Sequence, residues 1–142
     1  MLIIGPIMIT KKRKIGNLGE GIACRYIRKK GFDIIGRNYL RKCGEIDIIA
    51  KKEGELHFIE VKTVSREIPP HSTRDASRET AGYRPEDNLH KSKLERISKT
   101  IQLYLSEKKF PISCDWSFHV VTVFLDFKKR IARAHMLKDI IL

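Results

Sequence analysis

Three charged residues interrupt two segments that otherwise have the composition of buried strands. Asp47 lies within the apolar stretch 45–50, and Glu60 and Lys62 lie within 55–64, a stretch that is apolar on both faces. Carboxylates and ammonium groups are rarely buried unless they are paired. Two carboxylates with a lysine beside them favour a divalent-metal site, in which the ammonium group holds a phosphate or a water molecule.

This chemistry depends on how the two segments pair. If residues 53–54 are the central residues of a hairpin turn, Asp47 lies opposite Glu60, and Glu45 lies opposite Lys62. A four-residue turn about the same centre gives the same pairs, whereas an odd-length turn places the two acids on opposite faces. Facing side chains have Cβ atoms about 4.5–5.5 Å apart. Two carboxylates at that distance repel unless a proton or a cation lies between them, and we predict the even-length turn.

A structural interpretation of these residues fits the spacing equally well. Glu45 would then pair with Lys62, and Asp47 would cap a neighbouring backbone group. Glu20 lies on the edge of the apolar stripe of the first expected helix. A lone glutamate on a helix is usually a solvated charge, so Glu20 becomes a candidate site residue through its proximity to the two acids.

The elements that position these residues follow from hydrophobic periodicity. Helical spacing predicts two helices, and runs with strand character predict five strands. Gly31 is placed to end the first helix. The helices are expected at 16–30 and 86–109, and the strands at 33–40, 45–50, 55–64, 116–127 and 130–136. This order predicts an α/β fold, with a central mixed β-sheet flanked by helices. We assign 1–14 to an N-terminal tail or edge strand and 15–142 to a single domain.

A basic segment without core-forming residues separates the third strand from the second helix. Residues 65–84 are expected to form a flexible loop, because a loop of this length is usually functional or disordered. It carries four candidate nucleic-acid-binding residues: Arg66, Arg74, Arg78 and Arg84.

The composition points to a polyanionic partner. Lys and Arg number 29 against 17 Asp and Glu, which gives a formal net charge of +12 and a pI near 9.8. Nucleic acid is the commonest large polyanion, although a basic protein can also bind anions without specificity. Three separated cysteines predict neither a disulfide framework nor a zinc site. No run approaches the ~20 apolar residues of a membrane span, so we expect a cytoplasmic protein without a membrane partner.

At the same motifs the chain resembles a known group. The segments 16–23 (GNLGEGIA), 44–47 (GEID) and 58–63 (FIEVKT) resemble the YraN family, which is similar to archaeal Holliday-junction resolvases and belongs to the PD-(D/E)XK nuclease superfamily. The resemblance is strong over 15–63 and weaker over 85–123. It implies a restriction-endonuclease-like αβββαβ core and a homodimer, because resolvases that cut junctions symmetrically act as dimers.

The resemblance also assigns roles to residues. Asp47 and Glu60 would bind Mg²⁺ (or Mn²⁺), with the backbone carbonyl of Val61 as a further ligand. Lys62 would orient or activate the attacking water. Glu20 would be an accessory ligand, directly or through water.

Two further positions have open interpretations. Lys93 falls where the family carries a lysine, and phosphate contact is its candidate role, but a single helix lysine is more often a solvated charge. His119 replaces an acid of the family pattern. It either alters metal affinity and substrate choice or is a hydrogen-bonded structural histidine.

These observations lead to three functional hypotheses. The first is a Mg²⁺-dependent endonuclease that hydrolyses phosphodiester bonds of branched or structured DNA in recombination or repair. The second is a non-catalytic nucleic-acid-binding protein that retains the nuclease fold, and the third is an RNA nuclease. The fold alone does not choose among them, because one fold hosts many substrates.

Overall fold

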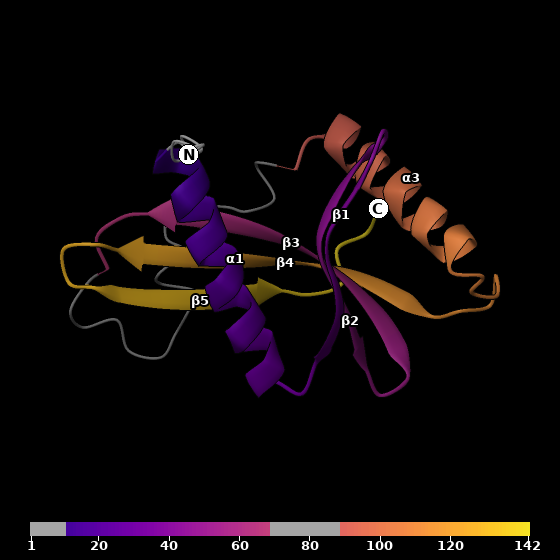
Figure 1. The fold of residues 1–142 in the computed structure, drawn as a ribbon, viewed down its shortest axis with the longest axis horizontal. Coiled ribbons are helices and arrows are strands. Elements are labelled where there is room, and N and C mark those ends of the chain that lie inside the picture. Colours follow the sequence, from indigo (N-terminus) through magenta and orange to yellow (C-terminus); the bar gives the residue numbers. More distant parts are fainter. Residues whose placement is uncertain (1–10, 69–88) are drawn as a thin grey trace, which may run out of the picture.

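A computed structural model describes residues 11–68 and 89–142 as a mixed α/β structure (Figure 1). The predicted fold class is confirmed, with the element order αβββαββ. The elements are α1 (Lys11–Lys29), β1 (Asp33–Arg41), β2 (Gly44–Lys52), β3 (Glu55–Ser65), α3 (Lys91–Glu107), β4 (Trp116–Asp126) and β5 (Ile131–Leu137). Neither described helix is both long enough and apolar enough to cross a lipid bilayer.

The five strands form one sheet in the order β1-β2-β3-β4-β5. Neighbouring strands are antiparallel, except that β3 and β4 are parallel. A parallel pair needs a crossover connection, and α3 lies on the chain between β3 and β4 (Figure 1). The central strands β3 and β4 are therefore covered on both sides, which explains why their sequences are apolar on both faces.

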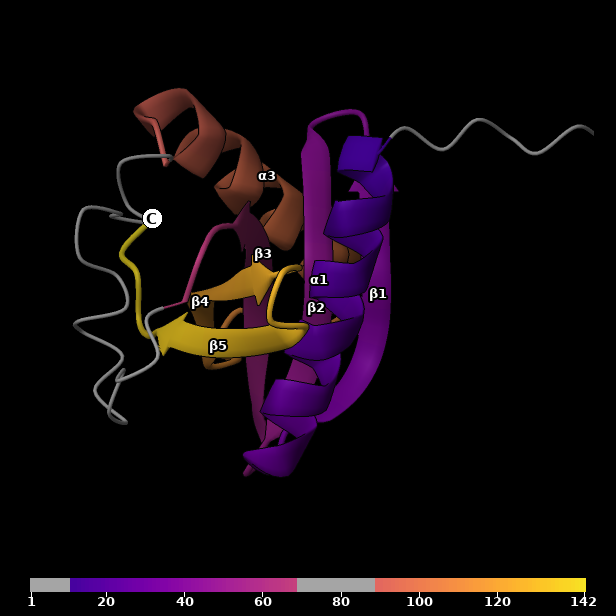
Figure 2. The same ribbon diagram turned by 90° about the vertical axis from the view of Figure 1, so that its left-hand side faces the viewer.

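The two helices pack on opposite faces of the sheet, and each covers its own core (Figure 2). The apolar stripe of α1, with Ala23 and Ile27, packs on residues of β2, β3, β4 and β5. The stripe of α3, with Ile97 and Ile101, packs on the other face of β2, β3 and β4. Any group at the centre of the sheet is therefore reached by α1 from one face and by α3 from the other.

The first helix begins earlier than expected. We predicted a start near residue 16 and a tail over 1–14, but α1 begins at Lys11, so residues 11–14 are helical. Ile15 packs against the α1 core, which gives this turn an apolar contact. The helix ends at Lys29, and Gly31 adopts φ +89°, as expected for a glycine just past a helix. The tail or edge strand predicted for residues 1–10 lies outside the described residues.

The second helix is shorter than predicted at both ends. It spans Lys91–Glu107 rather than 86–109, because His90 is extended and residues 108–109 form a turn. Of the expected basic loop, residue 65 belongs to β3 and 66–68 are described. Residues 69–88, including Arg74, Arg78 and Arg84, lie outside the described part of the chain.

The hairpin between β2 and β3 has the predicted register. Its central residues Glu53 and Gly54 have φ values of +52° and +79°, and two positive φ values are the signature of a two-residue type I′ turn. The ladder then pairs Lys52 with Glu55 and runs to Ile48 opposite Ile59. The even-length turn is confirmed, so Asp47 and Glu60 are the next residues on their strands.

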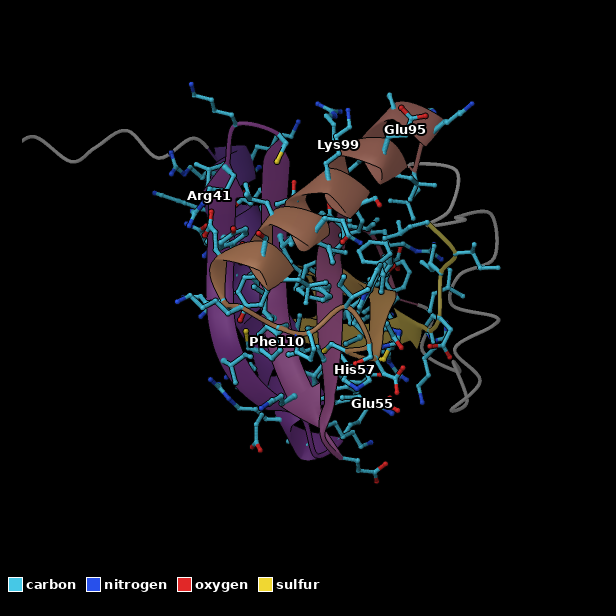
Figure 3. The ribbon with its side chains drawn as sticks, turned by 90° about the vertical axis from the view of Figure 1, so that its right-hand side faces the viewer. Arg41, Glu55, His57, Glu95, Lys99 and Phe110 are labelled. Carbon is cyan, nitrogen blue, oxygen red and sulfur yellow. The ribbon has the colours of Figure 1, made fainter. Side chains whose placement is uncertain are left out.

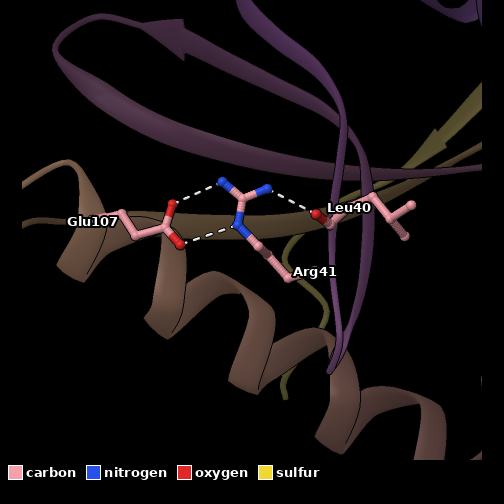
Figure 4. Close-up of polar contacts among 3 residues, drawn as sticks. All are labelled: Leu40, Arg41 and Glu107. Carbon is pink, nitrogen blue, oxygen red and sulfur yellow. Dashed lines mark hydrogen bonds and ion pairs between the residues drawn. The ribbon is translucent and has the colours of Figure 1, made fainter.

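The end of α3 is tied to the edge strand β1 by one arginine (Figure 4). Arg41 donates from Nε and Nη2 to the two oxygens of Glu107 at 3.0 and 2.9 Å, and from Nη1 to the Leu40 carbonyl at 2.7 Å. Glu95 and Lys99 lie on the same helix and are exposed (Figure 3). This exposed ion pair joins the C-terminal end of α3 to β1, and Lys93 lies near the other end of the helix.

Candidate active site

The sheet opens at the point where the two predicted acids lie. Within the described residues, the ladder between β2 and β3 ends at the Ile48–Ile59 pair. Beyond it, β2 stays paired with β1 as far as Gly44, and β3 stays paired with β4 as far as Ser65. We call this separation of β2 from β3 the fork. Asp47 and Glu60 are the first residues beyond the last pair, one on each arm.

Asp47 bridges the fork through the backbone of β3. Its Oδ2 accepts a hydrogen bond from the Val61 amide at 2.7 Å. In an extended strand, the N–H and C=O of one residue point to the same edge. The Val61 carbonyl therefore faces the same side as Asp47, which is the placement expected for a third oxygen ligand beside the two carboxylates.

Glu60 lies between two lysines. Its side chain is only 10% exposed, and its Oε1 accepts a hydrogen bond from Lys93 Nζ at 2.7 Å. Lys62, two residues along β3, places its own Nζ 3.9 Å from the same oxygen. The structure thus brings together the predicted Asp47, Glu60, Lys62 and Lys93, although Lys93 contacts an acid that the sequence could not assign to it.

Burial and neighbouring charges shift the pKa values of Asp47, Lys62 and Lys93. Burial, reinforced by the nearby charge of Glu60, raises the pKa of Asp47 to about 8. Burial and the neighbouring Lys93 lower the pKa of Lys62. For Lys93, burial is outweighed by hydrogen bonds to Glu60 and Lys62, so its pKa is raised. Lys93 is therefore the ammonium group that neutralises Glu60, whereas Lys62 is shifted toward its neutral amine.

Two hollows meet at the acid pair, and both are lined by Asp47 and Glu60. The larger has a volume of about 710 Å³ and is further lined by residues of α1 and β3: Lys11, Lys12, Ile15, Gly16, Glu20, Val61, Lys62, Thr63 and Ser65. The smaller has a volume of about 300 Å³ and is further lined by residues of β2 and α3: Gly44, Glu45, Lys93, Arg96 and Ile97. Because α1 and α3 cover opposite faces, the fork makes the acids accessible from both.

Glu20 reaches the larger hollow from α1, as predicted. Its side chain is 16% exposed and lies 4.0 Å from Arg37 Nη2. Its Oε1 is buried and has no hydrogen-bond partner among the described residues. Burial raises the pKa of Glu20, Arg37 opposes the shift, and the charges of Glu45 and Glu60 reinforce it. A buried carboxylate oxygen without a donor can accept a bond from a water or a cation in the hollow.

Gly19 is a positioning residue that the sequence did not reveal. A Cβ atom built on Gly19 would overlap the hydroxyl and the methyl group of Thr63 on β3. Glycine therefore allows α1 to lie directly against β3 at the fork, and this close approach brings the next residue, Glu20, to the larger hollow. A glycine inside a helix lowers helix stability, and that cost was the signal available in the sequence.

Two predicted residues have other surroundings. Glu45 lies opposite Leu40 in the β1–β2 ladder and lines the smaller hollow. The predicted contact between Glu45 and Lys62 does not form within the described residues, and Lys62 forms an ion pair with Glu60 instead. The reason is that β2 and β3 separate beyond the Ile48–Ile59 pair, before Glu45 and Lys62 can face each other. Arg66 stacks 5.2 Å from the centre of the Phe124 ring and lines neither hollow.

His119 is a buried structural histidine in β4, and it lines neither hollow. Its Nδ1 accepts a hydrogen bond from the Asp139 amide at 3.0 Å, and its Nε2 lies 2.9 Å from Nδ1 of His57. Burial and the adjacent His57 lower its pKa to about 4. Of the two interpretations drawn from the sequence, the hydrogen-bonded histidine matches this geometry.

The donor set fits a hard divalent cation held together with a substrate. Among the residues that the structure describes, no three His, Cys, Asp or Glu side chains form a metal-binding cluster. Two carboxylates and the Val61 carbonyl remain, and Mg²⁺ commonly binds one or two carboxylates while waters and substrate phosphates complete its shell. Burial and the charge of Glu60 raise the pKa of Asp47, and Glu20 Oε1 has no hydrogen-bond donor among the described residues; a cation in the hollow would stabilise both carboxylates.

Sequence comparison places these residues in a known family. The model of the uncharacterised protein family UPF0102 matches residues 19–123. The chain belongs to the UPF0102 family. A UPF0102 protein of Campylobacter jejuni (strain 81-176) is 40% identical over 108 residues, which cover 76% of this chain and 81% of the relative. A UPF0102 protein of Caldicellulosiruptor saccharolyticus is 30% identical over 128 residues, covering 90% and 97%. The UPF0102 match includes every residue of the acid and lysine group described above.

Proposed function

We propose that this UPF0102 protein is a metal-dependent endonuclease of the PD-(D/E)XK type, which hydrolyses phosphodiester bonds of branched or structured DNA in recombination or repair. The observation that carries the proposal is the pair Asp47 and Glu60, placed in the fork with Lys62 and Lys93 beside them. The net charge of +12 supports a nucleic-acid substrate, and the motifs around residues 16–23, 44–47 and 58–63 support the nuclease class.

The residues of the chain have distinct tasks in this reaction. Asp47, Glu60 and the Val61 carbonyl would hold Mg²⁺ or Mn²⁺, and the bound ion would supply positive charge to the phosphoryl oxygens. Lys62, whose pKa is lowered by burial, takes a proton from the attacking water as its oxygen bonds to phosphorus. The bond from phosphorus to the leaving sugar oxygen breaks, and that oxygen takes a proton from solvent.

Lys93 stabilises the phosphate. In the structure its ammonium group donates a hydrogen bond to Glu60 Oε1. Within reach of a phosphate bound at the acid pair, this ammonium group would offset the negative charge that develops during attack.

The same contact favours a second candidate function. Lys93 Nζ, 2.7 Å from Glu60 Oε1, already neutralises one acid without a metal. A nucleic-acid-binding protein that retained this fold without catalysis would be stable with this arrangement. An RNA nuclease would use the same chemistry as a DNA nuclease, so the substrate in the assay has to distinguish those two.

The test compares cleavage of a labelled four-way junction, a duplex, a single strand and an RNA strand, with Mg²⁺ or Mn²⁺ and with a chelator. We expect the wild type to cut at least one DNA substrate in a metal-dependent way. Asp47→Asn and Lys62→Ala should each lower the rate by about 10²-fold or more, as loss of a catalytic acid or base does. Lys99→Ala, an exposed lysine on α3, is the matched control and should keep the wild-type rate.

The alternatives have their own outcomes. Equal trace cleavage by the wild type, Asp47→Asn and Lys62→Ala would refute the proposal that the protein is a nuclease. Salt-sensitive binding that survives both substitutions would then support a non-catalytic nucleic-acid-binding protein. Metal-dependent cleavage of RNA but of no DNA substrate would support an RNA nuclease.

A further inference from the structure

The first turn of α1 carries a run of cations for which the proposed mechanism has no role. Residues 11–14 are Lys-Lys-Arg-Lys, and they form the start of the helix rather than a tail. Two of them, Lys11 and Lys12, line the larger hollow together with Asp47 and Glu60. Residues distant from the acids in sequence therefore form part of the wall of the same hollow.

These cations are unfavourable for the helix itself. The N-terminus of a helix carries a partial positive charge, so acids stabilise the first turn and cations destabilise it. Across Lys11–Lys29, the first turn contains no acid, and Lys11 and Lys14 are like charges three positions apart, which repel on a helix surface. A turn with only a structural role would gain stability from the opposite charges.

The charges around the hollow are ordered in space. Lys11 and Lys12 from α1 and Lys62 from β3 line the larger hollow, whereas Lys93 and Arg96 from α3 line the smaller one. The acid pair lies where the two hollows meet. Cationic groups therefore flank the acids on both sides, and a chain of regularly spaced phosphates can contact them in sequence, whereas a single phosphate cannot.

We propose that Lys11 and Lys12 bind backbone phosphates of a polynucleotide, on one side of the phosphodiester that lies at Asp47 and Glu60. The identity of that reacting bond rests on the proposed function, but the binding itself does not. The hollow of about 710 Å³ lies within the range of ligand-binding sites. The two lysines are substrate-binding residues, which place the strand without touching the reacting atoms.

The experiment measures binding of a fluorescent single-stranded oligonucleotide by anisotropy, with a chelator present, over a series of salt concentrations. The test variant is Lys11→Gln/Lys12→Gln. The matched control, Arg25→Gln/Lys29→Gln, removes the same charge from exposed positions farther along the same helix. Each lost phosphate contact on a single strand lowers the slope of log K against log salt by about 0.7. We expect the test variant to lose about 1.4 from the slope and the control to keep the wild-type slope.

The unfolding midpoint separates a loss of binding from a loss of folding. The unfolding midpoint of the test variant should be unchanged or higher, because cations leave the positive end of α1, so weaker binding would not reflect unfolding. A wild-type slope in the test variant, or an equal loss in the control, overturns the proposal. Because no metal is present, a failure to find cleavage leaves this result standing, and cleavage with an unchanged slope refutes the lysine assignment alone.

Discussion

Asp47 is held where its negative charge opposes folding. In the folded protein, burial and Glu60 raise its pKa to about 8, against a usual value of 3.8. The folded state therefore binds this proton more tightly than the unfolded chain does. Between pH 4 and 8 the unfolded chain has lost the proton that the folded chain keeps, so this group lowers the free energy of unfolding as the pH rises.

We therefore predict that Asp47→Asn stabilises the metal-free protein at alkaline pH. Asparagine keeps an oxygen that can accept the Val61 amide but carries no charge. The free energy of unfolding in urea with a chelator should rise by about 1–3 kcal/mol at pH 9, and the difference should vanish near pH 4. Asp33→Asn, at an exposed position, is the control and should show no such gain. A less stable Asp47→Asn at pH 9 would contradict this account.

Single site residues could be predicted from the sequence where a charged residue interrupted an apolar strand. Asp47, Glu60 and Lys62 were recognised because charges within apolar strands need a reason. Lys93 on Glu60, and Lys11 and Lys12 on the larger hollow, were not recognised. These contacts join elements far apart in the chain, and no spacing within one element encodes them.

At the scale of elements, the contact between Gly19 and Thr63 sets how closely α1 approaches β3. An added Cβ has no room there, so the helix would have to move away from the fork. We predict that Gly19→Ala lowers the free energy of unfolding by about 1–3 kcal/mol through overpacking, although alanine is the better helix former. Chemical denaturation measures the effect.

Gly21 provides a matched control on the same helix. A Cβ atom at Gly21 would meet nothing within 4 Å. Gly21→Ala should therefore stabilise the protein by about 0.5–1 kcal/mol, the usual gain from removing a helix glycine. If Gly19→Ala raises the free energy of unfolding to the same degree, the close approach of α1 to β3 does not contribute to stability.

Element boundaries were predictable where turn chemistry was explicit. The turn at residues 53–54 set the register of the β2–β3 hairpin, and Gly31 marked the end of α1. The start of α1 was missed because four cations in a first turn are the opposite of a helix start signal. Lysine and arginine are good helix formers, but at the N-terminus of a helix their charges oppose the helix dipole, so this pattern does not mark a start.

At the scale of the whole molecule, a chain of hydrogen bonds connects β3, β4 and the C-terminal segment. The Asp139 amide donates to His119 Nδ1, so in neutral His119 the proton is on Nε2, which donates to His57 Nδ1. Both rings must stay neutral to keep this order. Burial and His57 lower the pKa of His119 to about 4, and burial lowers that of His57.

This network predicts acid sensitivity. Between the usual histidine pKa of 6.5 and about 4, the unfolded chain binds a proton that folded His119 does not. The free energy of unfolding should therefore fall as the pH decreases across this window. His119→Asn should be less stable than the wild type at pH 7.5, and the gap should narrow at pH 4.5. His90→Gln, at an exposed position, should follow the wild-type profile; a constant gap for His119→Asn would contradict the prediction.

The architecture as a whole was predictable, whereas the fork was not. Periodicity predicted the mixed sheet and the two flanking helices, because each strand and helix has to bury its apolar face. Register predicts which residues face each other but does not predict where a ladder ends. Beyond that end, β2 remains paired with β1 and β3 remains paired with β4.

The hydrogen bond from Val61 to Asp47 gives the molecule a natural spectroscopic probe. This amide proton is bound by a side chain rather than by a neighbouring strand, so its resonance frequency responds to the charge on a single carboxylate. One cross-peak in a nitrogen–proton correlation spectrum can therefore follow the titration of Asp47 and test whether a cation or a substrate binds there, as we propose. No label has to be attached near the chemistry to observe it.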